Sequence, residues 1–347
     1  MENFLHIGYI IFTLLAIITS CVVFTNAVEH LGEKLHLSQG AVGCVLAAVG
    51  TALPETIVPL VAIIGAHLSH NDALGHEIGI GAILGAPFML GTLAFFVTGL
   101  AVVIFTKTKR RTIKMPINSN LMYRDFKYFA IGYSIAVLAA FLPNLFLKHL
   151  IAILLICWYC VYVYRTIKDH STTDECCDDL EELYLRKYLC LPNTLGMVYV
   201  QLMLSLLGII LFADVFVEQL KYFSNLLGIN PMILSLIIAP IATELPEKFN
   251  SVIWIRAKKD TLAMGNITGA MVFQSCIPTA VGLSLTPWML GMDAFVNIII
   301  VYLAVAVVYF NLKRNNGILS PYSLLAGGLF YLLYLVYVVL KIKGIIV

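Results

Sequence analysis

Charged residues are scarce in this chain of 347 residues: Asp, Glu, Lys and Arg together make up 12%, against about a quarter in an ordinary globular domain. The two signs nearly balance, with 22 Lys and Arg against 20 Asp and Glu, so no basic surplus exists to neutralise nucleic-acid phosphates. Hydrophobic residues account for 60% of the chain, and the mean hydropathy is +0.92. The composition therefore excludes a soluble enzyme, a disordered chain and a nucleic-acid partner, and it indicates an integral protein of the lipid bilayer.

The N-terminus also lacks a basic segment ahead of its first apolar run, so we expect a retained first helix rather than a cleaved signal. The apolar residues come in runs of about 20 rather than in ten-residue alternation, which is typical of membrane-spanning helices and not of barrel strands. Ten such runs predict an all-α integral membrane protein with ten transmembrane helices, at residues 5–27, 40–66, 76–105, 127–145, 148–167, 195–217, 228–255, 261–286, 292–312 and 320–342.

Basic residues are concentrated in alternate loops. Most of the 22 Lys and Arg fall in or beside residues 28–39, 106–126, 168–194, 256–260 and 313–319. Because cytoplasmic loops carry the excess of Lys and Arg, we expect these loops in the cytoplasm and both termini outside. The 106–126 loop is expected to anchor this topology, and contact with anionic lipid is the alternative interpretation of its charge.

Two short patterns occur twice in the chain. Residues 50–55 and 242–247 both read small-Thr-x-Leu-Pro-Glu, and one predicted helix later residues 81–86 and 265–270 both read Gly-x-Ile-x-Gly-Ala. Each half contains five predicted helices, an odd number, so the second half enters the membrane from the opposite side. We therefore expect two inverted five-helix repeats, at residues 1–167 and 195–347, joined by a cytoplasmic loop at 168–194, with a transport site at their interface.

The repeated Pro-Glu pair has a chemistry suited to a cation. A proline inside a helix removes a backbone hydrogen bond, so it is expected to interrupt the helix and free carbonyl oxygens beside the carboxylate that follows it. Carboxylates and carbonyls are the hard oxygen ligands that Ca²⁺ prefers. The residues that we expect to form this site are Glu55 and Glu247, with the helix-breaking Pro54 and Pro246 and the carbonyls of Thr51 and Thr243.

Other polar and small residues in the predicted helices have two interpretations each. Glu244 and Lys248 lie four residues apart in the order that favours an ion pair. Either they neutralise each other, or Glu244 joins the site and the Lys248 ammonium takes the place of a counter-ion. Asp214 is either a helix-end residue or a gating carboxylate. Small residues allow partner helices to approach closely, as we expect for Gly81, Gly85, Gly265 and Gly269.

These motifs resemble those of the calcium/cation antiporter superfamily, in particular its sodium/calcium exchanger branch. The resemblance implies Glu55 and Glu247 as the central Ca²⁺ carboxylates, backbone carbonyls from Thr51 and Thr243, and Asn266 at a polar position of the eighth helix. It also implies that the first and sixth helices slide over a four-helix core. The positions that such proteins use to hold Na⁺ are occupied here by Ala52, Glu244, Ala82, Ala86 and Ala270.

We therefore expect a secondary active antiporter that exchanges Ca²⁺ for a monovalent cation, Na⁺ or H⁺, by alternating access, with transported ions and no cofactor. The alternative is a proton-coupled exchanger of another divalent metal such as Mn²⁺. An intramembrane enzyme is disfavoured, because no His lies well inside a predicted helix to carry acid–base chemistry.

Overall fold

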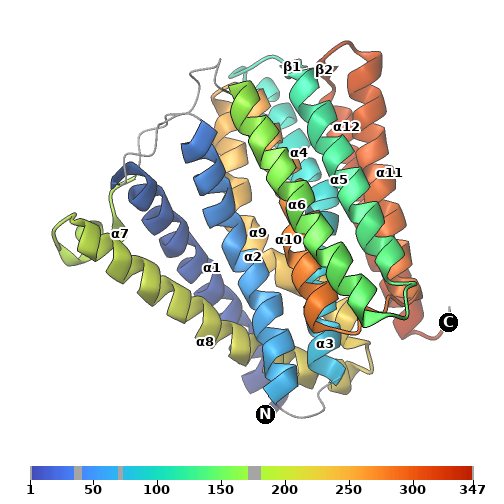
Figure 1. Ribbon diagram of the computed structural model, residues 1–347. Coiled ribbons are helices and arrows are strands. Elements are labelled where there is room, and N and C mark those ends of the chain that lie inside the picture. The colour runs from blue at the N-terminus through green and yellow to red at the C-terminus, as the bar shows by residue number, and fades with distance from the viewer. Residues whose placement is uncertain (1, 35–40, 69–72, 171–180, 346–347) are drawn as a thin grey trace.

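Helices make up most of the computed structural model, which describes residues 2–34, 41–68, 73–170 and 181–345 (Figure 1). The elements in chain order are α1 (Glu2–Lys34), α2 (Ala41–Leu68), α3 (Ala73–Met89), the π-helical η1 (Leu90–Ala94), α4 (Phe95–Lys107), β1 (Met115–Pro116), α5 (Ser119–Ala139), α6 (Leu145–His170), α7 (Tyr184–Leu189), α8 (Leu195–Leu227), α9 (Pro231–Arg256), α10 (Asp260–Leu285), α11 (Met292–Arg314), β2 (Ile318–Leu319) and α12 (Pro321–Ile342).

Most of each of the ten apolar ranges predicted from the sequence is helical. Among the described residues, seven helices are long and apolar enough to cross a membrane by length and composition. One of these runs for 35 residues from Ala73 to Lys107, because α3, η1 and α4 follow one another without interruption. The chain is therefore a helical, multi-pass integral membrane protein.

Several helix ends differ from the sequence prediction by two turns or more, among them the start of α5 and the end of α8. α5 begins at Ser119 rather than at 127, because the Asn118 side chain accepts a hydrogen bond from the Leu121 amide and caps its first turn. It ends at Ala139, ahead of the Pro143 turn. α8 continues to Leu227 rather than ending at 217, and Gly228 then terminates it in the left-handed conformation. Polar first and last turns of long helices carry no apolar signal, so hydropathy alone places these ends wrongly.

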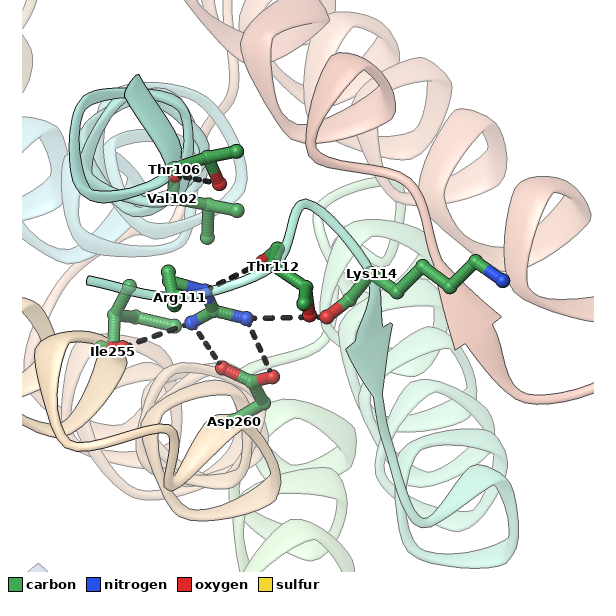
Figure 2. A network of polar contacts seen from close by, with 7 residues as sticks. All are labelled: Val102, Thr106, Arg111, Thr112, Lys114, Ile255 and Asp260. Atoms are coloured by element: carbon green, nitrogen blue, oxygen red, sulfur yellow. Dashed lines mark hydrogen bonds and ion pairs between the residues drawn. The ribbon is translucent and has the colours of Figure 1, made fainter. Parts of the chain in front are cut away.

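The predicted 106–126 loop is much shorter in the structure and is held in place by one buried arginine. Its strand β1 pairs antiparallel with β2, so Met115 lies opposite Leu319. The Arg111 guanidinium donates to both carboxylate oxygens of Asp260, at 2.6 and 2.8 Å, and to the backbone carbonyl of Ile255 at 2.8 Å (Figure 2). Arg111 therefore ties this loop to the end of α9 and the start of α10, and it does not face lipid.

The apolar core is divided into two clusters. The larger one fills the space among α3 to α6 and α9 to α12. The smaller one lies where α1 and α8 meet the rest of the bundle, and it includes Phe24 on α1, Phe216 on α8, Val58 on α2 and Ala239 on α9. Figure 1 shows α1 and α8 as a slanted pair at one edge of the bundle, and they pack closely along each other. This pair therefore has its own apolar contact surface with the remaining helices.

Hydrogen bonds join α1 to α8 and to the segment that connects the two halves of the chain. The Gln201 amide of α8 donates to the Asn26 side chain at 2.9 Å and to the Val23 carbonyl at 3.0 Å, both on α1. The Asn26 side-chain oxygen also accepts from the Tyr184 amide, and the Gln201 oxygen accepts from the Leu185 amide. Burial, together with nearby Glu181, raises the pKa of Tyr184 to about 12, so its hydroxyl stays protonated and donates to Glu181.

We expect Asp260→Asn to lower the free energy of unfolding by about 3 kcal/mol, because it leaves the buried Arg111 charge without its carboxylate partner. Chemical unfolding in detergent micelles measures this loss. The control is Glu218→Gln, which breaks an exposed ion pair with Lys221 and is expected to cost less than about 0.5 kcal/mol. Combining Arg111→Met with Asp260→Leu removes both charges, so it should recover most of the loss; equal instability in the double variant would contradict this account.

Candidate functional site

Four helices that carry the repeated motifs pack against one another: α2 with α3, α9 with α10, and each pair with the other. Helices α3 and α9 approach each other closely. A Cβ added at Gly81 would overlap the Met232 carbonyl oxygen, and one added at Gly85 would overlap the Leu236 carbonyl oxygen. The Ser235 hydroxyl of α9 donates to the Ile78 carbonyl of α3 at 2.7 Å. Two glycines one turn apart therefore let two helix backbones meet, as the sequence indicates for this pair.

Glu55 lies on α2 with its side chain 3% exposed, beside the buried Thr56. Such burial of an ionisable group inside a membrane protein is expensive, and it marks a functional position more often than a structural one. The expected break at Pro54 is not seen, because α2 is helical from Ala41 to Leu68 with both Pro54 and Pro59 inside it. The missing backbone hydrogen bond is thus accommodated within a continuous helix.

Glu244 on α9 is fully buried, and its neighbour Thr243 is 5% exposed. The side-chain nitrogen of Gln274 on α10 donates to one Glu244 carboxylate oxygen at 3.5 Å, the outer limit of a hydrogen bond. Gln274 is itself fully buried. This glutamine was not among the residues predicted from the sequence, although a single amide side chain deep in an apolar run is a signal that could have identified it.

Several predicted site residues lie outside the described side chains. These are Thr51 on α2, and Pro246, Glu247 and Lys248 on α9. The backbone of α9 is helical from Pro231 to Arg256, so it continues through Pro246 without a break. The contact between the two repeated carboxylates, and the pairing of Glu244 with Lys248, therefore stay predictions. Among the side chains that are described, no group of three or more His, Cys, Asp or Glu gathers as a metal site.

The glycines of α10 have looser surroundings than those of α3. The nearest described atom to a Cβ added at Gly265 is the Leu121 side chain at 3.5 Å, and at Gly269 it is the Tyr162 hydroxyl at 3.4 Å. Both distances are ordinary contacts, to side chains of α5 and α6. Asn266 between them is half-buried. The described surroundings therefore do not require glycine at these two positions.

A buried acid that the sequence analysis did not single out lies beside the same helix. Asp125 on α5 is 1% exposed. One of its carboxylate oxygens accepts from the Thr268 hydroxyl of α10 at 2.6 Å, and the other accepts from the Tyr162 hydroxyl of α6 at 3.1 Å. Asp125 thus joins three helices through one carboxylate. It lies near the polar start of α5, in a stretch that hydropathy assigns to a loop.

Asp214 does not lie at a helix end, which was one of its two interpretations. Because α8 extends to Leu227, Asp214 lies in the helix interior and not at its end, and its side chain is exposed. The helix-end interpretation is therefore wrong, and a gating role stays a prediction.

We expect Gly81→Ala and Gly85→Ala each to lower the free energy of unfolding by about 1–3 kcal/mol, because the new methyl group forces α3 away from the α9 backbone. Thermal unfolding in detergent measures the change. Gly65→Ala on α2 is the matched control, since nothing lies within 4 Å of the added Cβ and alanine favours a helix. Equal stability of Gly81→Ala and Gly65→Ala would contradict the close contact.

Comparison with known proteins identifies similar sequences and folds over nearly the whole chain. The family described as sodium/calcium exchanger protein matches residues 5–168 and 197–343. An uncharacterised membrane protein of Methanocaldococcus jannaschii is 23% identical over 273 residues, which cover 77% of this chain and 78% of that protein.

Two solved structures have a similar fold at low sequence identity. The crystal structure of the H⁺/Ca²⁺ exchanger CAX superposes with a TM-score of 0.72 at 16% identity, covering 97% of this chain and 87% of that one. The sodium-calcium exchanger NCX_Mj superposes with a TM-score of 0.58 at 18% identity, covering 96% of this chain and 98% of that one.

Proposed function

The chain belongs to the sodium/calcium exchanger protein family, and on that premise we propose that it is a secondary active antiporter exchanging Ca²⁺ for Na⁺ or H⁺ by alternating access. The observation that carries this proposal is the deep burial of Glu55 and Glu244 on α2 and α9, two helices that share a sequence motif and pack together. Proteins titled as an H⁺/Ca²⁺ exchanger and a sodium-calcium exchanger share the fold, which supports Ca²⁺ as the cargo and leaves two counter-ions open.

The proposed transport site lies among α2, α3, α9 and α10. Glu55 and Glu247 supply the central carboxylates, Thr51 and Thr243 supply oxygens from the same helical turns, and Asn266 supplies a polar group from α10. Glu244 and the side-chain oxygen of Gln274 extend the same set, since a carboxylate and an amide are both oxygen ligands for Ca²⁺.

The proposed architecture is two inverted repeats of five spanning helices, residues 1–167 and 195–347, connected by residues 168–194. The packing of the helices supports this arrangement of two inverted repeats. In the second half, α10 packs against α5 and α6. The equivalent helical segment of the first half, η1 with α4, packs against α11 and α12. The third spanning helix of each half therefore contacts the last two helices of the other half. This pattern is expected when the two halves are related by a two-fold axis in the membrane plane.

We place both termini outside and the basic loops in the cytoplasm. In Figure 1 the labelled N- and C-termini lie in the lower part of the view, while β1 and β2, which belong to two of the basic loops, lie at its top. The separation of the termini from the basic loops supports this topology, since Lys and Arg accumulate on the cytoplasmic side.

Alternating access is assigned to sliding of the α1–α8 pair over the four motif helices. The hydrogen bonds from Gln201 to Asn26 and Val23 make the pair move as one unit. Its contact with the bundle includes a separate apolar cluster, and packed apolar surfaces permit small sliding displacements. A displacement of this kind exposes the site to one side of the membrane at a time.

We expect Glu55→Gln and Glu247→Gln each to abolish radiolabelled Ca²⁺ uptake into proteoliposomes, because each removes a charge that offsets the divalent cation while preserving side-chain size. The control is Glu218→Gln on the exposed face of α8, which should transport normally. Undiminished uptake by either site variant, at equal reconstitution, would remove that residue from the transport site.

A second candidate is a proton-coupled exchanger of another divalent metal such as Mn²⁺. The contact between Gln274 and Glu244 favours it, since an amide beside a carboxylate stabilises both the ionised and the protonated acid and so suits a group that binds and releases H⁺. Alanine at residues 52, 82, 86 and 270, where Na⁺-coupled relatives are expected to have polar groups, points the same way.

Ion gradients imposed one at a time distinguish these candidates. We expect Ca²⁺ uptake to follow a pH gradient, or a Na⁺ gradient, but not an equal K⁺ gradient, because only the coupled ion is carried in exchange. Mn²⁺ competition against labelled Ca²⁺ in the same vesicles identifies the cargo. If neither gradient drives uptake of either metal, antiport itself is contradicted.

A further inference from the structure

A groove with a volume of about 440 Å³ lies between α5 and α6, and none of its lining residues belongs to the proposed transport site. Three cationic side chains and three aromatic rings line it: Arg124, Lys127 and Arg165, with Tyr123, Tyr128 and Trp158. We call it the basic groove. None of the described residues that line it is acidic, and Lys127 and Arg165 are exposed. The groove therefore presents positive charge to whatever lies alongside these two helices.

The floor of the basic groove is held rigidly. The Trp158 indole N–H of α6 donates to the Tyr128 carbonyl of α5 at 3.1 Å, and the two rings lie 4.6 Å apart. The Arg124 guanidinium is 5.6 Å from the centre of the Tyr162 ring, and its Nε lies 3.6 Å from the buried Asp125 carboxylate. Asp125 offsets one of the three positive charges, so the groove keeps a cationic surplus on a preorganised aromatic base.

The cations of the basic groove lie near one end of α5 and α6. α5 begins at Ser119 and α6 ends at His170, at the same end of the bundle. At 1.5 Å per residue, Arg124 and Arg165 lie about 8 Å from that end, and Lys127 lies about 12 Å from it. On the proposed topology this end faces the cytoplasm, and Trp and Tyr accumulate where membrane helices meet the headgroups.

We propose that the basic groove binds the phosphate headgroup of an anionic phospholipid. Arg and Lys are the side chains that recognise phosphate, and basic pockets between membrane helices on the cytoplasmic side suit such headgroups. Further along α6 the surface is apolar and exposed, at Ile153, Leu154 and Val161, which gives the acyl chains a contact surface that a free phosphate ion does not need. The inference uses the proposed position in the membrane but not the transport activity.

Bound lipid has a direct structural path to the motif helices. Arg124 contacts Asp125, and Asp125 in turn accepts the hydrogen bond from Thr268 of α10. A headgroup at Arg124 therefore lies two contacts away from a helix that carries one of the repeated motifs.

Trp158 provides a local readout of occupancy. The full-length chain is reconstituted in phosphatidylcholine bilayers containing increasing fractions of brominated phosphatidylglycerol, whose bromine atoms quench tryptophan fluorescence on contact. The quenching that disappears in Trp158→Phe is assigned to the groove. We expect brominated phosphatidylglycerol to quench Trp158 at about a tenfold lower fraction than brominated phosphatidylcholine, since each nearby basic residue favours an anionic headgroup.

Matched charge removals test whether this preference belongs to the groove. Lys127→Gln combined with Arg165→Gln is expected to reduce the preference about tenfold. Lys107→Gln combined with Arg110→Gln removes the same charge from exposed residues beside the loop after α4, and it should leave the preference within about twofold.

Three results would overturn the proposal: equal quenching by the two lipids, equal losses in the two double variants, or displacement of the lipid by millimolar inorganic phosphate. The last of these would assign the groove to a free phosphate ion. Ca²⁺ uptake is not part of the readout, so failure here is distinguishable from failure of the antiport proposal.

Discussion

A charge withdrawn from water into an apolar environment has to be held by partners, and the helix arrangement of this protein depends on where those partners lie. Arg111 and Asp260 tie a loop to the start of α10 through two parallel hydrogen bonds. Asp293 at the start of α11 accepts from Tyr337 and Lys341 of α12. In each case an ionised side chain joins elements that apolar packing alone would leave free to rotate about their axes.

The same constraint separates the structural charges from those proposed to bind ions. Asp125 and Asp260 receive hydrogen bonds from Thr, Tyr or Arg side chains at 2.6–3.1 Å, so their carboxylates are occupied by the protein itself. Glu244, equally buried, accepts a hydrogen bond at 3.5 Å from Gln274, whose amide also carries an oxygen atom. We therefore assign Glu244 and Gln274 to the proposed cation site, while Asp125 and Asp260 anchor the fold.

Sequence patterns predicted which segments are helical better than where each helix ends or breaks. Most of each apolar range is helical because a segment inside a bilayer must satisfy its own backbone hydrogen bonds, a local requirement that composition reveals. The ends of α5 and α8 were misplaced because polar end turns are held by Asn118 and Gly228, which carry no hydropathy signal. The break expected at Pro54 did not occur, since one lost hydrogen bond does not end a helix packed on several neighbours.

What the sequence by itself determined is the class of molecule: a chain with 12% charge and long apolar runs must fold as membrane helices, and two copies of Leu-Pro-Glu mark its proposed site. What only the tertiary structure decided is which helices touch. The approach of Gly81 and Gly85 to the α9 backbone, the placement of Gln274 beside Glu244, and the three-helix junction at Asp125 all join residues far apart in the chain. Such contacts depend on the rotation and depth of each helix relative to its neighbours, and neither quantity is encoded in the periodicity of a single helix.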